Sequence, residues 1–347
     1  IENNNLNKMF VKALSYHKNN KIREAANEYI KIIKLDPKNF RAYNNLGAIN
    51  ENINKNNLAK ELFLNAIKLN PNYIDAIFNL GNICNKLKDY NLAKDYFEKI
   101  IKIDPKNEIA YNALGITFYN LQNLANAKLC FQKIININNK NYQAYYNLGK
   151  ILNEEENHEE AINLFNESIE IDPLSNETYL ILANSYYEAG NNQMAIESAQ
   201  KALDASPNDF QPNYSLGQIL ALTGEKKSAI EYIEKAISID PANSDAIRQL
   251  AMLYYEDDQK EKSIETFKSA IESEQDKNRK ADLYYNLGVL NMQLNNYNDA
   301  DIAFEEAYYL NEEDFEALLG MATLYEQLGD KYFNGTEENF KKDYFQA

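Results

Sequence analysis

The sequence has no tryptophan, two cysteines, two histidines and seven prolines in 347 residues. No uninterrupted apolar run approaches the ~20 residues that a membrane-spanning helix needs, so we expect none. The two histidines, His17 and His158, lie far apart, and no Ser-His-Asp arrangement can be argued from them. No glycine-rich loop that could hold a phosphate occurs among the eleven glycines. The sequence therefore predicts a protein segment that is not an enzyme and has no cofactor.

The acidic run at residues 154–160 could attract a cation, but it lacks the spacing and the turn glycine of a calcium loop. We interpret it as a solvated turn and predict no metal site. The cysteines, Cys84 and Cys130, have no C-x-x-C or Cys/His spacing. Core thiols are the interpretation that fits, and they favour a reducing, cytoplasmic compartment, although the sequence itself leaves the localisation unknown.

Charge is unevenly distributed along the chain. Residues 1–141 hold 21 Lys+Arg against 12 Asp+Glu, whereas residues 142–347 hold 15 against 40. Such polarity can orient a charged partner, and the alternative is a solvated surface whose composition drifts along the chain. The acidic majority of the surface argues against nucleic acid as a partner.

A fixed period of about 34 residues organises the chain, which is typical of stacked repeats rather than of a globular domain. Repeats start near residues 6, 40, 74, 108, 142, 176, 210, 244, 281 and 315, and we number positions from each start. The eighth position is always Gly or Ala, which predicts a close approach of two helices. We therefore expect one all-α solenoid over residues 1–347, with each repeat forming two antiparallel helices.

Local signals mark where the helices end and restart. A proline follows the second helix in six repeats, because proline cannot continue a helix. Two residues later a capping side chain can accept orphan amide hydrogen bonds. These candidate N-caps are Asn39, Asn107, Asn141, Ser175, Asp209, Asn243 and Asp314.

Two irregularities interrupt the period. Three extra residues at 278–280 predict a longer loop between the eighth and ninth repeats. After Gly329, an insertion at 330–342 delays the motif until Asp343. The last repeat is then incomplete at Ala347, which leads us to expect that the natural protein continues.

The columns of Leu-Gly, Ala, Phe and Pro resemble the tetratricopeptide repeat (TPR) family over nearly the whole chain. This resemblance implies a right-handed superhelix whose first helices line a concave groove. It also implies that groove side chains come from positions 2, 5, 6, 9, 12 and 13 of the first helices.

Two columns are candidates for binding a peptide in that groove. Position 6 carries Asn45, Asn79, Asn147 and Asn286. Side-chain amides can bind a peptide backbone without reading its sequence, and the column resembles the asparagine ladder of O-GlcNAc transferases. The alternative is that Asn before Leu-Gly is simply common in this repeat. Positions 5 and 12 carry aromatic rings that we expect to face the groove: Phe78, Tyr119, Tyr146, Tyr187, Tyr214, Tyr255 and Tyr285.

The leading hypothesis is a protein-interaction scaffold that binds an extended peptide or a helix of another protein. Acidic groove positions such as Glu154, Glu188 and Glu256 suggest a ligand with some basic residues. The alternative is the substrate-recruiting arm of a larger enzyme, such as a glycosyltransferase, whose catalytic part would follow residue 347. Self-association, through the open C-terminal end or the oppositely charged ends, is a third possibility.

Overall fold

The computed structural model describes residues 2–311 and 315–332, and every regular element within these ranges is a helix. In the first half the helices are α1 (Glu2–Lys18), α2 (Ile22–Leu35), α3 (Phe40–Asn52), α4 (Asn56–Leu69), α5 (Ile74–Lys86), α6 (Tyr90–Ile103), α7 (Glu108–Asn120), α8 (Leu124–Ile137), α9 (Tyr142–Glu154) and α10 (His158–Ile171). In the second half they are α11 (Asn176–Glu188), α12 (Asn192–Ala205), α13 (Phe210–Leu222), α14 (Lys226–Ile239), α15 (Ser244–Glu256), α16 (Lys260–Ser273), α17 (Lys277–Gln293), α18 (Tyr297–Leu310) and α19 (Phe315–Tyr332).

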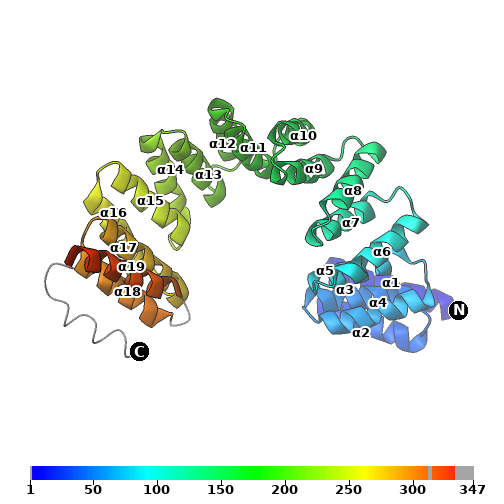
Figure 1. Cartoon of the computed structure of the whole chain (residues 1–347). Helices are drawn as coiled ribbons and strands as arrows, with labels where there is room; N and C mark the ends of the chain where they lie inside the picture. The colour runs from blue at the N-terminus through cyan, green and yellow to red at the C-terminus, as the bar shows by residue number, and fades with distance from the viewer. Residues whose placement is uncertain (1, 312–314, 333–347) are drawn as a thin grey trace. The chain divides into compact units, whose positions relative to one another are not determined.

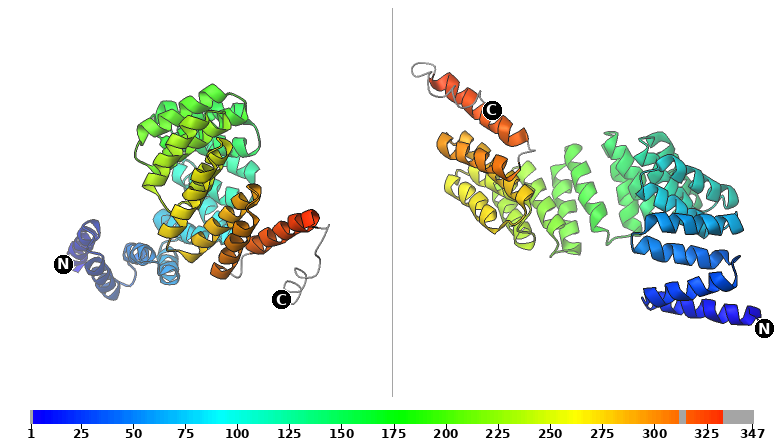
Figure 2. Two further views of the ribbon diagram at one scale, coloured as in Figure 1. Left: turned by 90° about the vertical axis from the view of Figure 1, so that its left-hand side faces the viewer. Right: turned by 90° about the horizontal axis from the view of Figure 1, so that it is seen from below.

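The chain forms two compact units, Ile1–Pro173 and Leu174–Ala347, which we call the N-terminal and C-terminal units and describe separately. Within each unit, consecutive helices pack as antiparallel pairs, and each pair is one repeat (Figures 1 and 2). This arrangement confirms the predicted all-α architecture of helix pairs. That both units belong to one continuous solenoid stays a prediction.

The turn inside each repeat is made in the same way nine times. The residue at position 15 has a positive φ in every one of these turns, which lets the chain leave the first helix through the left-handed region. Two of the nine are Gly190 and Gly224, for which this conformation carries no steric penalty. The others are Asn20, Asn54, Lys88, Gln122, Glu156, Asp258 and Asn295.

Most of the predicted N-caps hold the start of a first helix. Asn39, Asn107, Asn141, Ser175 and Asn243 each accept a hydrogen bond from the backbone N–H three residues later. The prediction was wrong for Asp209, whose side chain makes no cap hydrogen bond. There the buried Asn213 amide donates to the carbonyls of Pro207 and Asp209 instead. Asp314 lies outside the described residues.

The core of each repeat is built on the small residue at position 8. A β-carbon placed on Gly81 would lie 2.7 Å from Cε1 of Phe97, the ring at position 24 of the paired second helix. Gly47, Gly115, Gly149 and Gly288 face the equivalent Phe in the same way, and Gly217 faces Ile233. The predicted close approach is therefore a contact between the backbone of the first helix and a buried side chain of the second.

The extra residues at 278–280 lengthen a helix and not a loop, so that prediction was wrong. Helix α17 begins at Lys277, and the connection from α16 contains only residues 274–276. The Asp276 side chain accepts from the Arg279 N–H, and the buried Glu274 accepts from the N–H groups of Gln275 and Asp276. The Asp276 bond caps the first turn of α17, and the Glu274 bonds hold the two residues directly before the helix, so helix extension is favourable.

Helix α19 also departs from the repeat. It continues through Gly329 to Tyr332, where the repeat pattern predicts a turn after Gly329. The remainder of the predicted insertion at 330–342, and the motif expected after it, lie outside the described residues.

We predict that Gly81→Ala destabilises the protein by about 1–3 kcal/mol, because the added methyl overlaps the Phe97 ring inside a packed core. The expected result is a lower melting temperature of the full chain and faster hydrogen exchange in α5 and α6. Gly329→Ala is the control, since nothing lies within 4 Å of a β-carbon there. A Gly81→Ala protein as stable as the parent would contradict this account of the repeat core.

We also predict that the two thiols are unreactive in the folded chain. Both cysteines are buried and free, and burial raises the pKa of Cys84 and raises that of Cys130 to about 12. Because only the thiolate is the nucleophile, a disulfide reagent at about pH 8 should label neither residue until denaturant is added. Rapid labelling of the native protein would show that the cores around them open readily.

Candidate functional site

The eleven candidate residues lie on first helices, and all of them are half-buried. Six belong to the N-terminal unit: Asn45, Phe78, Asn79, Tyr119, Tyr146 and Asn147. Five belong to the C-terminal unit: Tyr187, Tyr214, Tyr255, Tyr285 and Asn286. We call the solvent-facing sides of α3, α5, α7 and α9 the N-terminal face, and those of α11, α13, α15 and α17 the C-terminal face.

Two of the four asparagines tie neighbouring first helices together. The Asn79 amide on α5 donates to Oδ1 of Asn44 on α3 at 3.0 Å. Two repeats later, the Asn147 amide on α9 donates to Oδ1 of Asn112 on α7 at 3.2 Å. The sequence reasoning overlooked Asn44 and Asn112, although both stand at position 5 of the preceding repeat. The side-chain NH₂ groups of Asn79 and Asn147 thus donate to the neighbouring helix, and their carbonyl oxygens can accept a hydrogen bond from another group.

The other two asparagines have different partners. Asn45 donates to the Tyr29 hydroxyl at 3.2 Å and accepts from Asn44 at 3.3 Å. Asn286 donates to the Asp282 carbonyl of its own helix at 2.8 Å. The column therefore does not act as one uniform row of amides, because its members make three kinds of hydrogen bond.

The aromatic rings at position 5 contribute to the cores as well as to the faces. Phe78, Tyr146 and Tyr285 pack against the buried rings Phe97, Phe165 and Phe304, with centroids 5.7, 6.1 and 5.8 Å apart. The sequence predicts that these rings face the groove. Each of these rings is instead half-buried against the second helix of its own repeat, which fixes its position and leaves one side toward solvent.

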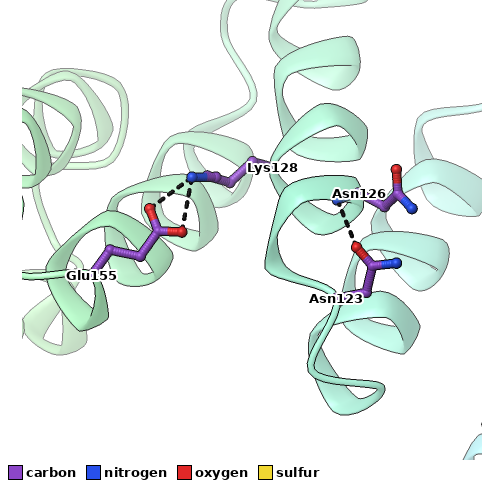
Figure 3. Close-up of polar contacts among 4 residues, drawn as sticks. All are labelled: Asn123, Asn126, Lys128 and Glu155. Atoms are coloured by element: carbon purple, nitrogen blue, oxygen red, sulfur yellow. Dashed lines mark hydrogen bonds and ion pairs between the residues drawn. The ribbon is translucent and has the colours of Figure 1, made fainter.

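Two carboxylates at the end of α9 bind side chains of the preceding repeat. The Tyr119 hydroxyl donates to Glu154 at 2.5 Å, and this hydrogen bond raises the pKa of Tyr119 to about 12. Glu155, next along the chain, accepts from the Lys128 ammonium at 2.6 and 2.9 Å (Figure 3). Two of the five carboxylates in the predicted solvated turn are therefore engaged in fixing α9 against α7 and α8.

Exposed isoleucines give the N-terminal face an apolar centre that the sequence reasoning missed. Ile109 and Ile116 on α7 are 66% and 41% exposed. They stand at positions 2 and 9, where the neighbouring first helices carry polar or small residues such as Asp75 and Asn82. The signal was present as two isoleucines at groove positions, and Tyr119 lies one helical turn beyond Ile116.

The C-terminal face combines tyrosines with acidic side chains. Tyr187, Tyr214 and Tyr255 pack against the apolar clusters beneath them, and burial raises the pKa of Tyr214. Glu177 and Glu188 on α11 are exposed. Farther along this unit Asp245 pairs with Arg248, and Glu256 pairs with Lys226, both as exposed ion pairs.

Two kinds of feature are absent from the described residues. Residues 2–311 and 315–332 hold no group of three or more His, Cys, Asp or Glu side chains that could bind a metal ion. None of the described helices is long and apolar enough to cross a membrane.

We predict that the amide pairs stabilise the stack of first helices. In a double-mutant cycle of Asn112→Ala and Asn147→Ala, the coupling free energy should be about 0.5–1.5 kcal/mol, as for a partly buried neutral hydrogen bond. Asn120→Ala, on an exposed position of α7, is the control and should change stability by less than about 0.5 kcal/mol. Simple additivity of the two pair variants would mean that the hydrogen bond contributes nothing.

Comparison with known proteins agrees with the repeat. Tetratricopeptide repeat family models match residues 13–54, 40–73, 74–107, 109–141, 142–173, 181–244, 227–284 and 281–314. No curated protein matches the chain. A solved tetratricopeptide repeat protein from Parabacteroides merdae is 20% identical over 72% of this chain and 98% of its own, with a TM-score of 0.56. The C-terminal part of a TPR repeat-containing protein from Cytophaga hutchinsonii is 18% identical over 70% of this chain and 99% of its own, with a TM-score of 0.53. From the helix-pair period, the position-8 contacts and these matches, the chain belongs to the tetratricopeptide repeat family.

Proposed function

We propose that this protein is an interaction scaffold that binds segments of other proteins on the faces of its first helices. The observation that carries the proposal is the exposed pair Ile109 and Ile116, which lies between amide-rich helices on the N-terminal face. Exposed apolar side chains on an otherwise polar face are typical anchors for a partner side chain. Tyr119 adds a ring whose hydroxyl is already held by Glu154.

Fixed side chains support a binding role for this face. Asn79 and Asn147 are held by amide partners, so little side-chain freedom is left to lose when a ligand binds. Their carbonyl oxygens can accept hydrogen bonds from the N–H groups of an extended peptide. The N-terminal face thus suits a segment with a central apolar residue and unpaired backbone amides.

The C-terminal face suits a segment with basic residues. Glu177 and Glu188 are exposed there, and the tyrosines provide rings on which Lys or Arg side chains can lie. Residues 174–347 carry 14 Lys+Arg against 32 Asp+Glu, so this unit as a whole attracts cationic partners. The side chains thus favour a different class of ligand for each unit: a segment with a central apolar residue for the N-terminal face, and a basic segment for the C-terminal face.

The reading as a recruiting arm of a larger enzyme has less support. It depended partly on a partial asparagine ladder, already interrupted at Ala113, Ile181, Ser215 and Gln249, and of its four members Asn286 donates to its own helix. Self-association stays a prediction that sedimentation at low and high salt would test. The scaffold reading needs neither a further domain nor a second copy.

We predict that peptides selected against the full chain from a random phage-displayed library bind the N-terminal face through Ile109 and Ile116. The double variant Ile109→Ser/Ile116→Ser should weaken these peptides about tenfold or more, because it removes the apolar anchor without opening the core. Affinity would be measured by titration calorimetry on the folded variants.

Leu129→Ser provides the matched control. Leu129 is 67% exposed, as Ile109 is, but it lies on the second helix α8. Peptide affinity should be unchanged in this variant. Equal affinity of the selected peptides for the parent and the isoleucine variant would refute the proposed anchor.

A further inference from the structure

A lysine-rich segment recurs at the ends of the second helices α2, α4, α6 and α8. The four segments, residues 31–40, 65–74, 99–108 and 133–142, contain nine lysines and three carboxylates. The lysines recur at repeat positions 26 (Lys31, Lys99, Lys133) and 29 (Lys34, Lys68, Lys102). They recur again at position 33, in the loop to the next repeat, as Lys38, Lys106 and Lys140. In the fifth repeat Glu167 and Glu170 take the first two positions, so the pattern ends there.

These segments lie along one edge of the N-terminal unit. Because the helices of each repeat are antiparallel, every second helix ends at the edge opposite the turn inside the repeat (Figure 1). We call this side, with its four loops, the lysine edge. Among the described residues, only Lys31 of the nine lysines forms an ion pair, with Glu28. The other eight lysines have no carboxylate partner among the described residues, and all of them are exposed except the half-buried Lys99.

The carboxylates of the lysine edge are occupied by local hydrogen bonds. Asp36 accepts from the Lys38 N–H and the Asn39 amide, and Asp104 accepts in the same way from Lys106 and Asn107. Glu108 accepts from the Asn138 and Asn141 amides. These bonds hold the loops in shape, while the lysines remain the side chains that are free to reach a partner.

Exposed aliphatic side chains accompany the lysines. Position 30, directly after Lys34, Lys68 and Lys102, is Leu35, Leu69 and Ile103. These three are 64%, 38% and 37% exposed. Before three of the four loops, a lysine is therefore followed by an exposed aliphatic side chain at the same edge.

Helix stabilisation alone does not account for this pattern. Lysines near a helix C-terminus do complement its macrodipole. However, Lys38, Lys106 and Lys140 lie beyond the helix ends, where that effect is weak. The second helices α12, α14 and α16 form at the same length with no basic residue in their last turn. The lysines are thus not needed for the helices on which they lie.

We propose that the lysine edge binds the surface of an anionic phospholipid bilayer. Basic side chains near such a surface are attracted by its negative potential, and their contributions add along a row. Leu35, Leu69 and Ile103 enter the boundary between headgroups and acyl chains, where apolar side chains gain from burial. The bilayer then holds the chain by its edge and leaves the faces of the first helices open to a protein ligand.

The same side chains fit other polyanions less well. Nucleic acid offers phosphates but no apolar layer for the exposed Leu35, Leu69 and Ile103. Proteins that read nucleic acid also use arginine and exposed aromatic rings, which these lysine positions lack. An acidic protein partner would meet lysines in solvated pairs, which contribute little, and lysine is depleted from protein interfaces. An anionic bilayer matches both features of the lysine edge, because its headgroups attract the lysines and its apolar layer accepts the aliphatic side chains.

Flotation of the full chain with vesicles tests this proposal. Vesicles of phosphatidylcholine, with and without phosphatidylserine, would be compared at low and high salt. The parent chain should bind only the phosphatidylserine vesicles and should dissociate at high salt. The variant Lys34→Gln/Lys38→Gln/Lys102→Gln/Lys106→Gln should lose about tenfold or more of this binding.

The control variant is Lys18→Gln/Lys21→Gln/Lys55→Gln/Lys88→Gln. It removes four exposed lysines from the opposite edge of the same unit, so the net charge changes equally. It should keep most of the vesicle binding. A third variant, Leu35→Ser/Leu69→Ser, should bind more weakly than the parent at every salt concentration at which the parent binds.

Several results would overturn the proposal. Equal loss in the two lysine variants would indicate general charge attraction and not an edge. Binding to a DNA duplex but not to vesicles, with no effect of Leu35→Ser/Leu69→Ser, would assign the edge to nucleic acid. A salt-sensitive oligomer that needs the edge lysines, without vesicle binding, would assign it to a second copy of this chain.

Discussion

The contact between position 8 of a first helix and position 24 of its second helix is the constraint on which each repeat depends. A ring such as Phe97 packs onto the backbone of Gly81, and no β-carbon fits between them. Close packing at this point brings the two helices together along one stripe and turns their other sides outward. Where Ala183 replaces glycine, the position-24 residue is the small Ala199, so the volume of the pair is compensated. Ala13 and Ala251 instead share a buried cluster with the rings of Tyr29 and Phe267, so the first and eighth repeats accommodate a β-carbon at position 8.

Much of the fold could be predicted because the same physical requirement is written many times in one chain. Capping at Asn39 or Asn107 follows from local chemistry that each repeat contains again, whereas the positive φ at position 15 was not predicted, because residues such as Lys88 and Gln122 give no local signal for it. The start of α17 could not be predicted in this way, since it occurs once. Extra residues can lengthen a loop or a helix. Here Asp276 caps the lengthened helix by accepting from the Arg279 N–H, and Glu274 holds the short connection before it.

The sequence predicted which helices carry the candidate residues, but not which side chains those residues contact. Sequence spacing places Asn79 on the outer side of α5, yet the same spacing also brings it within reach of Asn44 on α3. A period cannot distinguish an amide that points to a ligand from one that points to the next helix. The same limit applies to Phe78 and Tyr146, whose rings are shared between core and surface. Ile109 and Ile116 could not be found from recurrence, because each differs from the residues at the same position in the neighbouring repeats.

The residues repeated in every unit are needed for packing, so we expect binding residues at the positions that packing leaves variable. Positions 8, 20 and 24 must fill the core in every unit, and prolines and caps must end and restart helices. Positions 2, 9, 26, 29 and 33 have no such role in packing. Ile109 departs from its column there, and lysine recurs at positions 29 and 33 only in the first four repeats. The first-helix faces and the lysine edge use different helices and different positions, so substitutions in one leave the packing of the other unchanged. A stack of helix pairs can for that reason carry two kinds of binding surface, because substitutions on either surface leave the packing of the helices unchanged.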